Sequence, residues 1–284
     1  MIRKGHHGLR PGQTMHLSIT TRLRWHCEEP TDSLLQIEVA ATSGQRLLAN
    51  AFEGTPAGHV TRVPAQDGIG ERIWLHQEGD CTVTYAAEVE VLGRSVALET
   101  LAALPPHRLP GEAVPYLMDS RYCPANRFSP FVDEEFAAFE GGAKVAAMRD
   151  WIAAHYRYVP GVSDASTTAI DSFVERRGVC RDYAHTLICF ARAAAIPARF
   201  ASGYGADVTP QDFHAVAEVW LANPEGVGGW HLVDATGMAD TASFAQIAVG
   251  RDAADTSFLT SFGQADLREL AIEVREVASL NHVR

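Results

Sequence analysis

The sequence predicts an α+β protein in which an N-terminal antiparallel β-sandwich precedes a domain of helices packed on an antiparallel sheet. Residues 15–98 alternate apolar and polar side chains with a period of two, which is typical of strands. From residue 143 onward the apolar spacing first follows the helical period. Residues 103–115, between these regions, contain four prolines and indicate a boundary. We therefore expect a flexible arm at residues 1–14, the sandwich at 15–105 and the second domain at 106–284.

Composition limits the classes of protein to which this chain can belong. It has 284 residues, of which 46% are hydrophobic and 21% charged, so it can fill a core and is not a disordered chain. The formal net charge is −11 at pH 7 with neutral histidines. A protein that binds nucleic acid needs a basic face. We therefore expect no nucleic-acid partner.

The expected location is cytoplasmic. No run of 18 apolar residues is present, so we expect neither a transmembrane helix nor a membrane partner. The basic start of the chain is not followed by the apolar segment of a secretory signal. The cysteines are odd in number and scattered, which favours reduced thiols: Cys27, Cys81, Cys123, Cys180 and Cys189.

The strands expected in the sandwich lie at residues 16–25, 34–40, 59–63, 72–77 and 81–92. Turn-rich segments at residues 28–33, 53–59 and 64–71 separate them. Several short alternating strands at this spacing are typical of a sandwich.

Helices are expected first in the second domain, within residues 142–160, 163–178 and 180–196. The second should stop near Gly178, and the third must end before Pro197 because proline breaks a helix. Four strands should follow, at residues 198–205, 213–222, 229–235 and 267–277.

Cys180 is the first candidate for chemistry, because it stands at the start of the third expected helix. Unpaired backbone N–H groups and the positive end of the helix dipole favour thiolate over thiol there. The same N–H groups can bind the oxyanion that forms when sulfur attacks a carbonyl. Cys189, nine residues later, falls on the opposite face of the helix, so we expect it to have a structural role. The alternative for Cys180 is a buried core cysteine.

A hairpin downstream can supply the base that a thiolate needs. On the strand at 213–222, His214 lies on the more polar face, and the opposite face is uniformly apolar. If Trp220 pairs with Trp230 across the hairpin, Asp234 comes opposite Val216 and near His214 on the same face. The carboxylate would fix the imidazole tautomer and stabilise the imidazolium. Alternatively, the histidine is structural and the aspartate is a turn former.

These residues sit in motifs that resemble the bacterial transglutaminase-like family. The matching motifs are G-V-C-R-D-Y-A at 178–184, R-A-A-A-I-P-A-R at 192–199, G-Y at 203–204, H-A-x-x-E-V at 214–219 and G-W-x-x-x-D-A-T at 229–236. The resemblance is strong across residues 143–240 and weaker over the N-terminal β region. It implies a papain-like α+β core with a Cys-His-Asp triad of Cys180, His214 and Asp234.

The resemblance also has limits. Val216 and Ala235 stand where the family usually has tryptophan and often has proline, so the substrate does not carry over. Three further residues are weaker candidates for supporting or substrate-binding roles: Asp182, Tyr204 and Glu218. Each also has an ordinary structural interpretation, as a helix-end carboxylate, a packed tyrosine and a salt-bridged glutamate.

We expect no cofactor and no metal site, because neither C-x-x-C nor H-E-x-x-H occurs and no segment fits a calcium loop. The expected function is acyl transfer or hydrolysis on a peptide or protein amide through a thioester, with hydrolysis slightly favoured. Transglutaminase-type cross-linking and a non-catalytic scaffold on the same fold are the alternatives. A zinc site built from cysteine, histidine and aspartate would need a further ligand.

Overall fold

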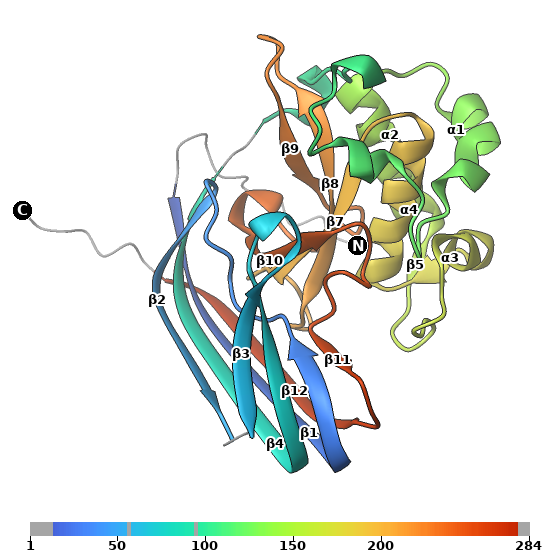
Figure 1. Ribbon diagram of the computed structural model, residues 1–284. Coiled ribbons are helices and arrows are strands. Elements are labelled where there is room, and N and C mark those ends of the chain that lie inside the picture. The colour runs from blue at the N-terminus through green and yellow to red at the C-terminus, as the bar shows by residue number, and fades with distance from the viewer. Residues whose placement is uncertain (1–13, 56–57, 94–95, 278–284) are drawn as a thin grey trace, which may run out of the picture.

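The computed structural model describes residues 14–55, 58–93 and 96–277, and it contains two antiparallel sheets with helices on one side of the second sheet (Figure 1). The expected arm at residues 1–14 lies outside the described residues except for Thr14, with which the first strand begins. Among the described residues, no helix is both long and apolar enough to cross a membrane.

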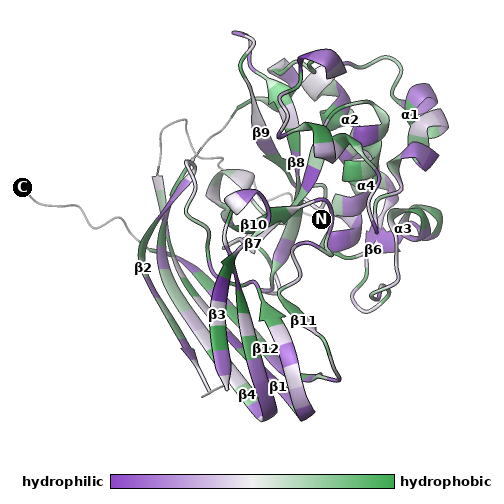
Figure 2. Cartoon of the chain, in the orientation of Figure 1, coloured by the Kyte–Doolittle hydropathy of each residue, from purple (hydrophilic) through white to green (hydrophobic). Residues whose placement is uncertain are grey.

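Two long strands form the centre of the first sheet. Strand β1 runs from Thr14 to Leu35 and pairs along its length with β4, Glu71–Leu92. On the β1 side of this pair, β12 (Asp266–Val277) and β11 (Leu259–Ser261) pair with opposite ends of β1. On the β4 side, β2 (Gln45–Gly54) and β3 (His59–Pro64) pair with opposite ends of β4. Apolar and polar residues alternate along these strands (Figure 2), as a sheet with one buried face requires.

The N-terminal region therefore forms one antiparallel sheet, and not the two packed sheets that a sandwich would have. The turn expected at residues 28–33 lies inside β1, where the register with β4 shifts between Cys27 and Thr31. Such a bulge accommodates Pro30, which cannot donate to the ladder. The strand expected at 34–40 ends at Leu35, and β2 was not expected at all.

The end of the described chain returns to the first sheet. Strands β11 and β12 pair with β1, so residues 259–277 belong to the same sheet as residues 14–92 and not to the helical region. The boundary expected at residue 105 therefore does not separate residues 259–277 from the first sheet. The buried face of this sheet packs on Tyr204, Ala245 and Ile247 of the second sheet.

The second sheet has the order β10-β7-β8-β9. Its strands are β7 (Ala198–Tyr204), β8 (His214–Ala222), β9 (Gly228–Val233) and β10 (Ala245–Gly250). Every residue of β7, β8 and β10 is buried. The more polar face of β8 is thus covered as well, because Val216 packs with Phe244 and Val208.

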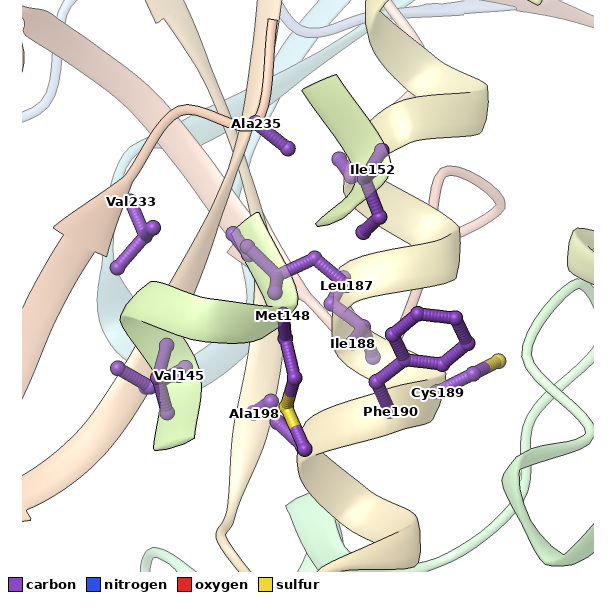
Figure 3. Close-up of a cluster of buried hydrophobic side chains, with 14 of the residues drawn as sticks. Val145, Met148, Ile152, Leu187, Ile188, Cys189, Phe190, Ala198, Val233 and Ala235 are labelled. Atoms are coloured by element: carbon purple, nitrogen blue, oxygen red, sulfur yellow. The ribbon is translucent and has the colours of Figure 1, made fainter. Parts of the chain in front are cut away.

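Four α-helices lie on one face of the second sheet: α1 (Ser129–Glu135), α2 (Gly141–His155), α3 (Ala169–Glu175) and α4 (Cys180–Ala193). Helix α4 packs directly on β8 and β7, and the other three helices pack around α4. Figure 3 shows part of this core, with Met148 and Ile152 of α2 and Leu187 of α4. Short 3-10 turns occupy Gln66–Gly68, Leu98–Thr100, Pro106–Arg108, Val114–Leu117, Ala125–Phe128 and Thr241–Ser243. Two-residue strands β5 (Arg157–Tyr158) and β6 (Arg177–Gly178) pair in parallel just before α4.

Candidate active site

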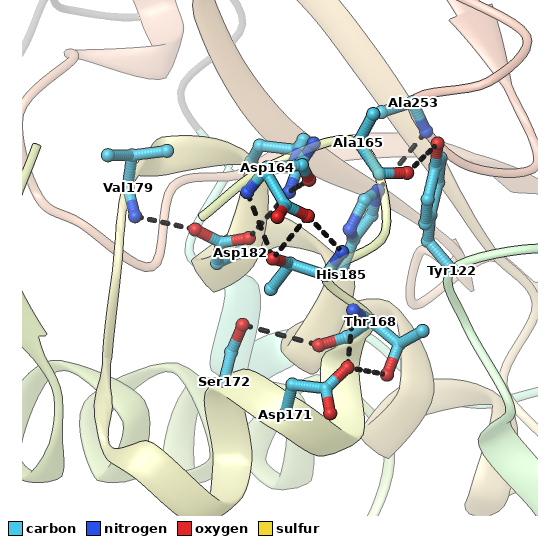
Figure 4. A network of polar contacts seen from close by, with 12 residues as sticks. Tyr122, Asp164, Ala165, Thr168, Asp171, Ser172, Val179, Asp182, His185 and Ala253 are labelled. Carbon is cyan, nitrogen blue, oxygen red and sulfur yellow. Dashed lines mark hydrogen bonds and ion pairs between the residues drawn. The ribbon is translucent and has the colours of Figure 1, made fainter. Parts of the chain in front are cut away.

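Cys180 is the first residue of α4 and is half-buried, whereas the other four cysteines are buried. The preceding turn is fixed by Asp182, whose Oδ2 accepts a hydrogen bond of 2.8 Å from the backbone N–H of Val179 (Figure 4). Glycine is required at residue 178 because a Cβ there would lie 2.5 Å from the Cβ of Asp182. Together these contacts present the thiol at the N-terminal end of the helix.

His214 begins strand β8, and its side chain meets Asp234 just beyond β9. The Nε2 atom of His214 lies 3.0 Å from Oδ2 of Asp234, and both residues are buried. The hairpin pairs Trp220 with Trp230, which is the register expected from the sequence. With Nε2 engaged by the carboxylate, Nδ1 is the ring nitrogen left for a second partner.

The second partner of the imidazole is Cys180. Both residues line the same cavity, and Sγ of Cys180 lies 4.0 Å from the backbone oxygen of Phe213, the neighbour of His214. Burial disfavours the imidazolium, but hydrogen bonding to Asp234 and to Cys180, with their charges, outweighs burial and raises the pKa of His214 to about 10. The imidazole is therefore held in its protonated form at neutral pH.

Asp234 is held in place by donors that the sequence did not reveal. Its Oδ1 accepts from the backbone N–H of Thr236 at 2.7 Å, and its Oδ2 accepts from the backbone N–H of Ala239 at 2.8 Å. Burial raises the pKa of Asp234, but His214, followed by the N–H of Ala239 and the hydroxyl of Thr236, more than compensates, so the pKa is lowered overall. The loop after β9 thus keeps a buried carboxylate ionised beside the imidazole.

Tyr158 is a neighbour of the thiol that sequence reasoning missed. The pairing of β5 with β6 sets Tyr158 opposite Gly178, and the N–H of Val159 donates to the Gly178 oxygen at 2.9 Å. Burial raises the pKa of Tyr158, and the adjacent Cys180 side chain raises it further. The phenol therefore stays a hydrogen-bond donor beside the sulfur. In the sequence, nothing marks Tyr158 as a neighbour of the thiol except that it is an aromatic residue upstream of the cysteine.

Of the three weaker candidates, only Asp182 lies next to Cys180. Asp182 fixes the first turn of α4, as described above. Tyr204 is fully buried between the sheets, where its hydroxyl donates to the Ile37 oxygen at 2.7 Å, so it does not border the cavity. Glu218 is buried and accepts from Nε of Arg199 at 2.6 Å, on the part of β8 away from His214. The structure thus gives Tyr204 and Glu218 structural partners and places neither of them on the wall of the cavity that Cys180 and His214 line.

The described residues contain no group of three or more histidine, cysteine, aspartate or glutamate side chains arranged to hold a metal ion. His6 and His7 lie outside the described residues. The zinc alternative for Cys180, His214 and Asp234 therefore has no additional ligand from this part of the chain.

The family model of the transglutaminase-like superfamily matches residues 134–235, a span that contains Cys180, His214 and Asp234. The crystal structure of the "Putative Cysteine Protease" from Cytophaga hutchinsonii is 30% identical, covers 94% of this chain and 92% of its own, and superposes with a TM-score of 0.85. The chain belongs to the transglutaminase-like superfamily.

A second relative of this transglutaminase-like chain is an uncharacterized protein of Mycobacterium leprae. It is 28% identical over 218 residues, which cover 72% of this chain and 75% of the relative. The resemblance seen in the sequence is confirmed, as is the α+β fold class with helices packed on an antiparallel sheet. The transglutaminase-like core brings together the three residues that the sequence selected.

Proposed function

We propose that this protein is a cysteine-dependent acyl hydrolase of peptide or protein amides. The observation that supports this most strongly is the placement of His214, which bonds Asp234 through Nε2 and shares a cavity with Cys180. A nucleophile beside a base that a carboxylate orients is the arrangement used for covalent acyl transfer. The name of the Cytophaga protein is consistent with the same activity.

In the first half of the reaction, the sulfur of Cys180 attacks the carbonyl carbon of the amide and a C–S bond forms. The carbonyl oxygen becomes an oxyanion, which the backbone N–H groups at the start of α4 and the hydroxyl of Tyr158 stabilise. The imidazolium of His214 gives its proton to the leaving nitrogen, and the C–N bond breaks. An amine departs and a thioester remains.

In the second half, water attacks the thioester carbonyl and gives a proton to His214, which now acts as a base. The C–S bond breaks, the acid is released, and the starting protonation state returns. An amine in place of water would give a cross-linked product by the same steps. Product analysis with and without added primary amine separates hydrolysis from transglutaminase-type transfer.

Selective modification of Cys180 tests whether it is the nucleophile. We expect iodoacetamide at neutral pH to label Cys180 at least about tenfold faster than the other cysteines, as measured by peptide mass mapping. The other four are buried. Burial also raises the pKa of Cys81 to about 11 and that of Cys189 well above its ordinary value. Equal labelling of all five would leave a non-catalytic scaffold as the better interpretation.

The role of Tyr158 is tested by replacing it with phenylalanine. Loss of one oxyanion donor typically lowers kcat by about a hundredfold to a thousandfold. We expect Tyr158→Phe to show such a loss with little change in KM or in the rate of Cys180 labelling. Tyr156→Phe is the matched control, because that hydroxyl contacts Thr186 at 3.0 Å inside the core. An unchanged kcat for Tyr158→Phe would remove the phenol from the mechanism.

A further inference from the structure

The cavity that contains Cys180 and His214 has a volume of about 640 Å³, which is in the range of small-ligand sites. Its walls come from three separate parts of the chain. Gln36 follows β1 of the first sheet, Ser202 lies on β7 of the second, and Thr256 precedes β11. The N-terminal sheet and the return of the chain to it therefore help to build the cavity next to the thiol.

Three residues that line this cavity carry buried donors with no hydrogen-bond partner among the described residues. They are Nε2 of Gln36, Oγ of Ser202 and Oγ1 of Thr256, on residues with exposed fractions of 2%, 9% and 4%. Native proteins satisfy almost all buried polar groups, because an unpaired one costs about 1–3 kcal/mol. Three such groups on residues that line the cavity of a candidate nucleophile indicate a site built for a ligand rich in hydrogen-bond acceptors.

The charge around the cavity favours an anionic ligand. Arg121 and Arg181 both line it, and both guanidinium groups lie over the ring of Tyr122, at 5.1 and 5.6 Å from its centroid. Arg121 makes no ion pair with any described residue. Arg181 is already paired, since its Nη2 lies 3.4 Å from Oδ1 of Asp182, although its Nε is buried without a partner. The opposing carboxylate on the cavity wall is Asp212, and burial raises its pKa.

We propose that this cavity binds the acyl residue of the substrate and selects one whose side chain ends in a carboxylate. The hydroxyls of Ser202 and Thr256 and the amide of Gln36 would donate to its oxygens, and the guanidinium of Arg121 would balance its charge. This inference rests on the proposed function, since it assigns the substrate class of the same site. It also gives the N-terminal sheet a role in substrate recognition, through Gln36.

Peptide binding to the full-length Cys180→Ala protein tests the inference without turnover. The probes are three acetylated peptide amides that differ only in a terminal glutamate, glutamine or methionine residue. We expect the glutamate peptide to bind about ten- to a hundredfold more tightly than the methionine peptide in calorimetry, because hydrogen bonds to a charged group are worth about 1.5–3 kcal/mol. The glutamine peptide should fall between them. Equal binding of glutamate and methionine peptides would overturn the inference, and tighter binding of glutamine than glutamate would overturn the carboxylate assignment.

Substitution of the donors separates recognition from stability. In the same Cys180→Ala background, Gln36→Met and Thr256→Val should lower the affinity for the glutamate peptide about tenfold each while leaving the melting temperature equal or higher. Gln77→Met is the control, since Gln77 is a buried glutamine that already donates to Ser33 at 3.2 Å. It should melt at a lower temperature and bind normally. A lower melting temperature for Gln36→Met with unchanged binding would make Gln36 structural and contradict the inference.

The two proposals fail in different ways. Unselective labelling of Cys180 together with a glutamate preference would reject the proposed hydrolase and keep the binding site. Selective labelling and turnover without any preference would reject the binding site and keep the hydrolase.

Discussion

Cys180→Ala is expected to abolish turnover of every amide that the wild-type protein hydrolyses. Removal of the nucleophile from a triad hydrolase costs roughly a millionfold in kcat, because the covalent route is lost as a whole. The measurement is a screen of peptide and amide substrates that compares the purified wild-type and variant proteins. The substitution is small and lies at a half-buried position at the start of α4, so the fold should be retained.

The matched control for this experiment is Cys189→Ala. Cys189 lies in the same helix but faces the core, where it is fully buried (Figure 3). We expect this variant to keep wild-type turnover at temperatures below its own unfolding. Turnover that survives in Cys180→Ala, or disappears equally in both variants, would show that Cys180 is not the nucleophile.

His214→Gln is expected to reduce kcat by a comparable factor, since nucleophile and base act as one unit. The glutamine amide can still donate to Asp234, so the buried carboxylate keeps a partner. Labelling of Cys180 by iodoacetamide should slow at neutral pH, because the nearby imidazolium no longer favours the thiolate. Unchanged labelling and turnover would exclude His214 as the base.

The same variant gives a pH-dependent difference in stability. The pKa of His214 is about 10 in the folded protein, against about 6.5 for an unfolded chain, so the proton stabilises the folded state. The difference in unfolding free energy between wild type and His214→Gln should therefore be greatest below about pH 6.5 and shrink as the pH rises towards 10. Calorimetric melting temperatures across this range measure it. A difference that grows with pH would mean that the imidazole is neutral in the fold.

Local sequence signals were sufficient to predict the hairpin and its register. Residues 215–221 alternate so that one face is wholly apolar, and a shift by one residue would turn that face away from α4. The pairing of Trp220 with Trp230 then places Asp234 near His214. The helix start at Cys180 was also predictable, because Gly178 and the apolar stripe that follows are local features.

Features that depend on pairing between distant segments could not be predicted. The first sheet alternates in the same way whether its strands form one layer or two, so the periodicity alone suggested a sandwich. The strand at residues 267–277 was expected, but nothing local shows that it pairs with β1. For Glu218 and Tyr204 the sequence left a supporting role and a structural role open, because their partners, Arg199 and Ile37, depend on tertiary packing.

The return of β12 to β1 has a consequence for biosynthesis. Strand β1 is made before β12, so the edge of β1 opposite β4 stays unpaired by β12 until residues 266–277 have left the ribosome. The segment that carries Thr256 to the thiol cavity is likewise made after Cys180 and His214. A chain made only as far as β10 would thus present Cys180 in an incomplete cavity.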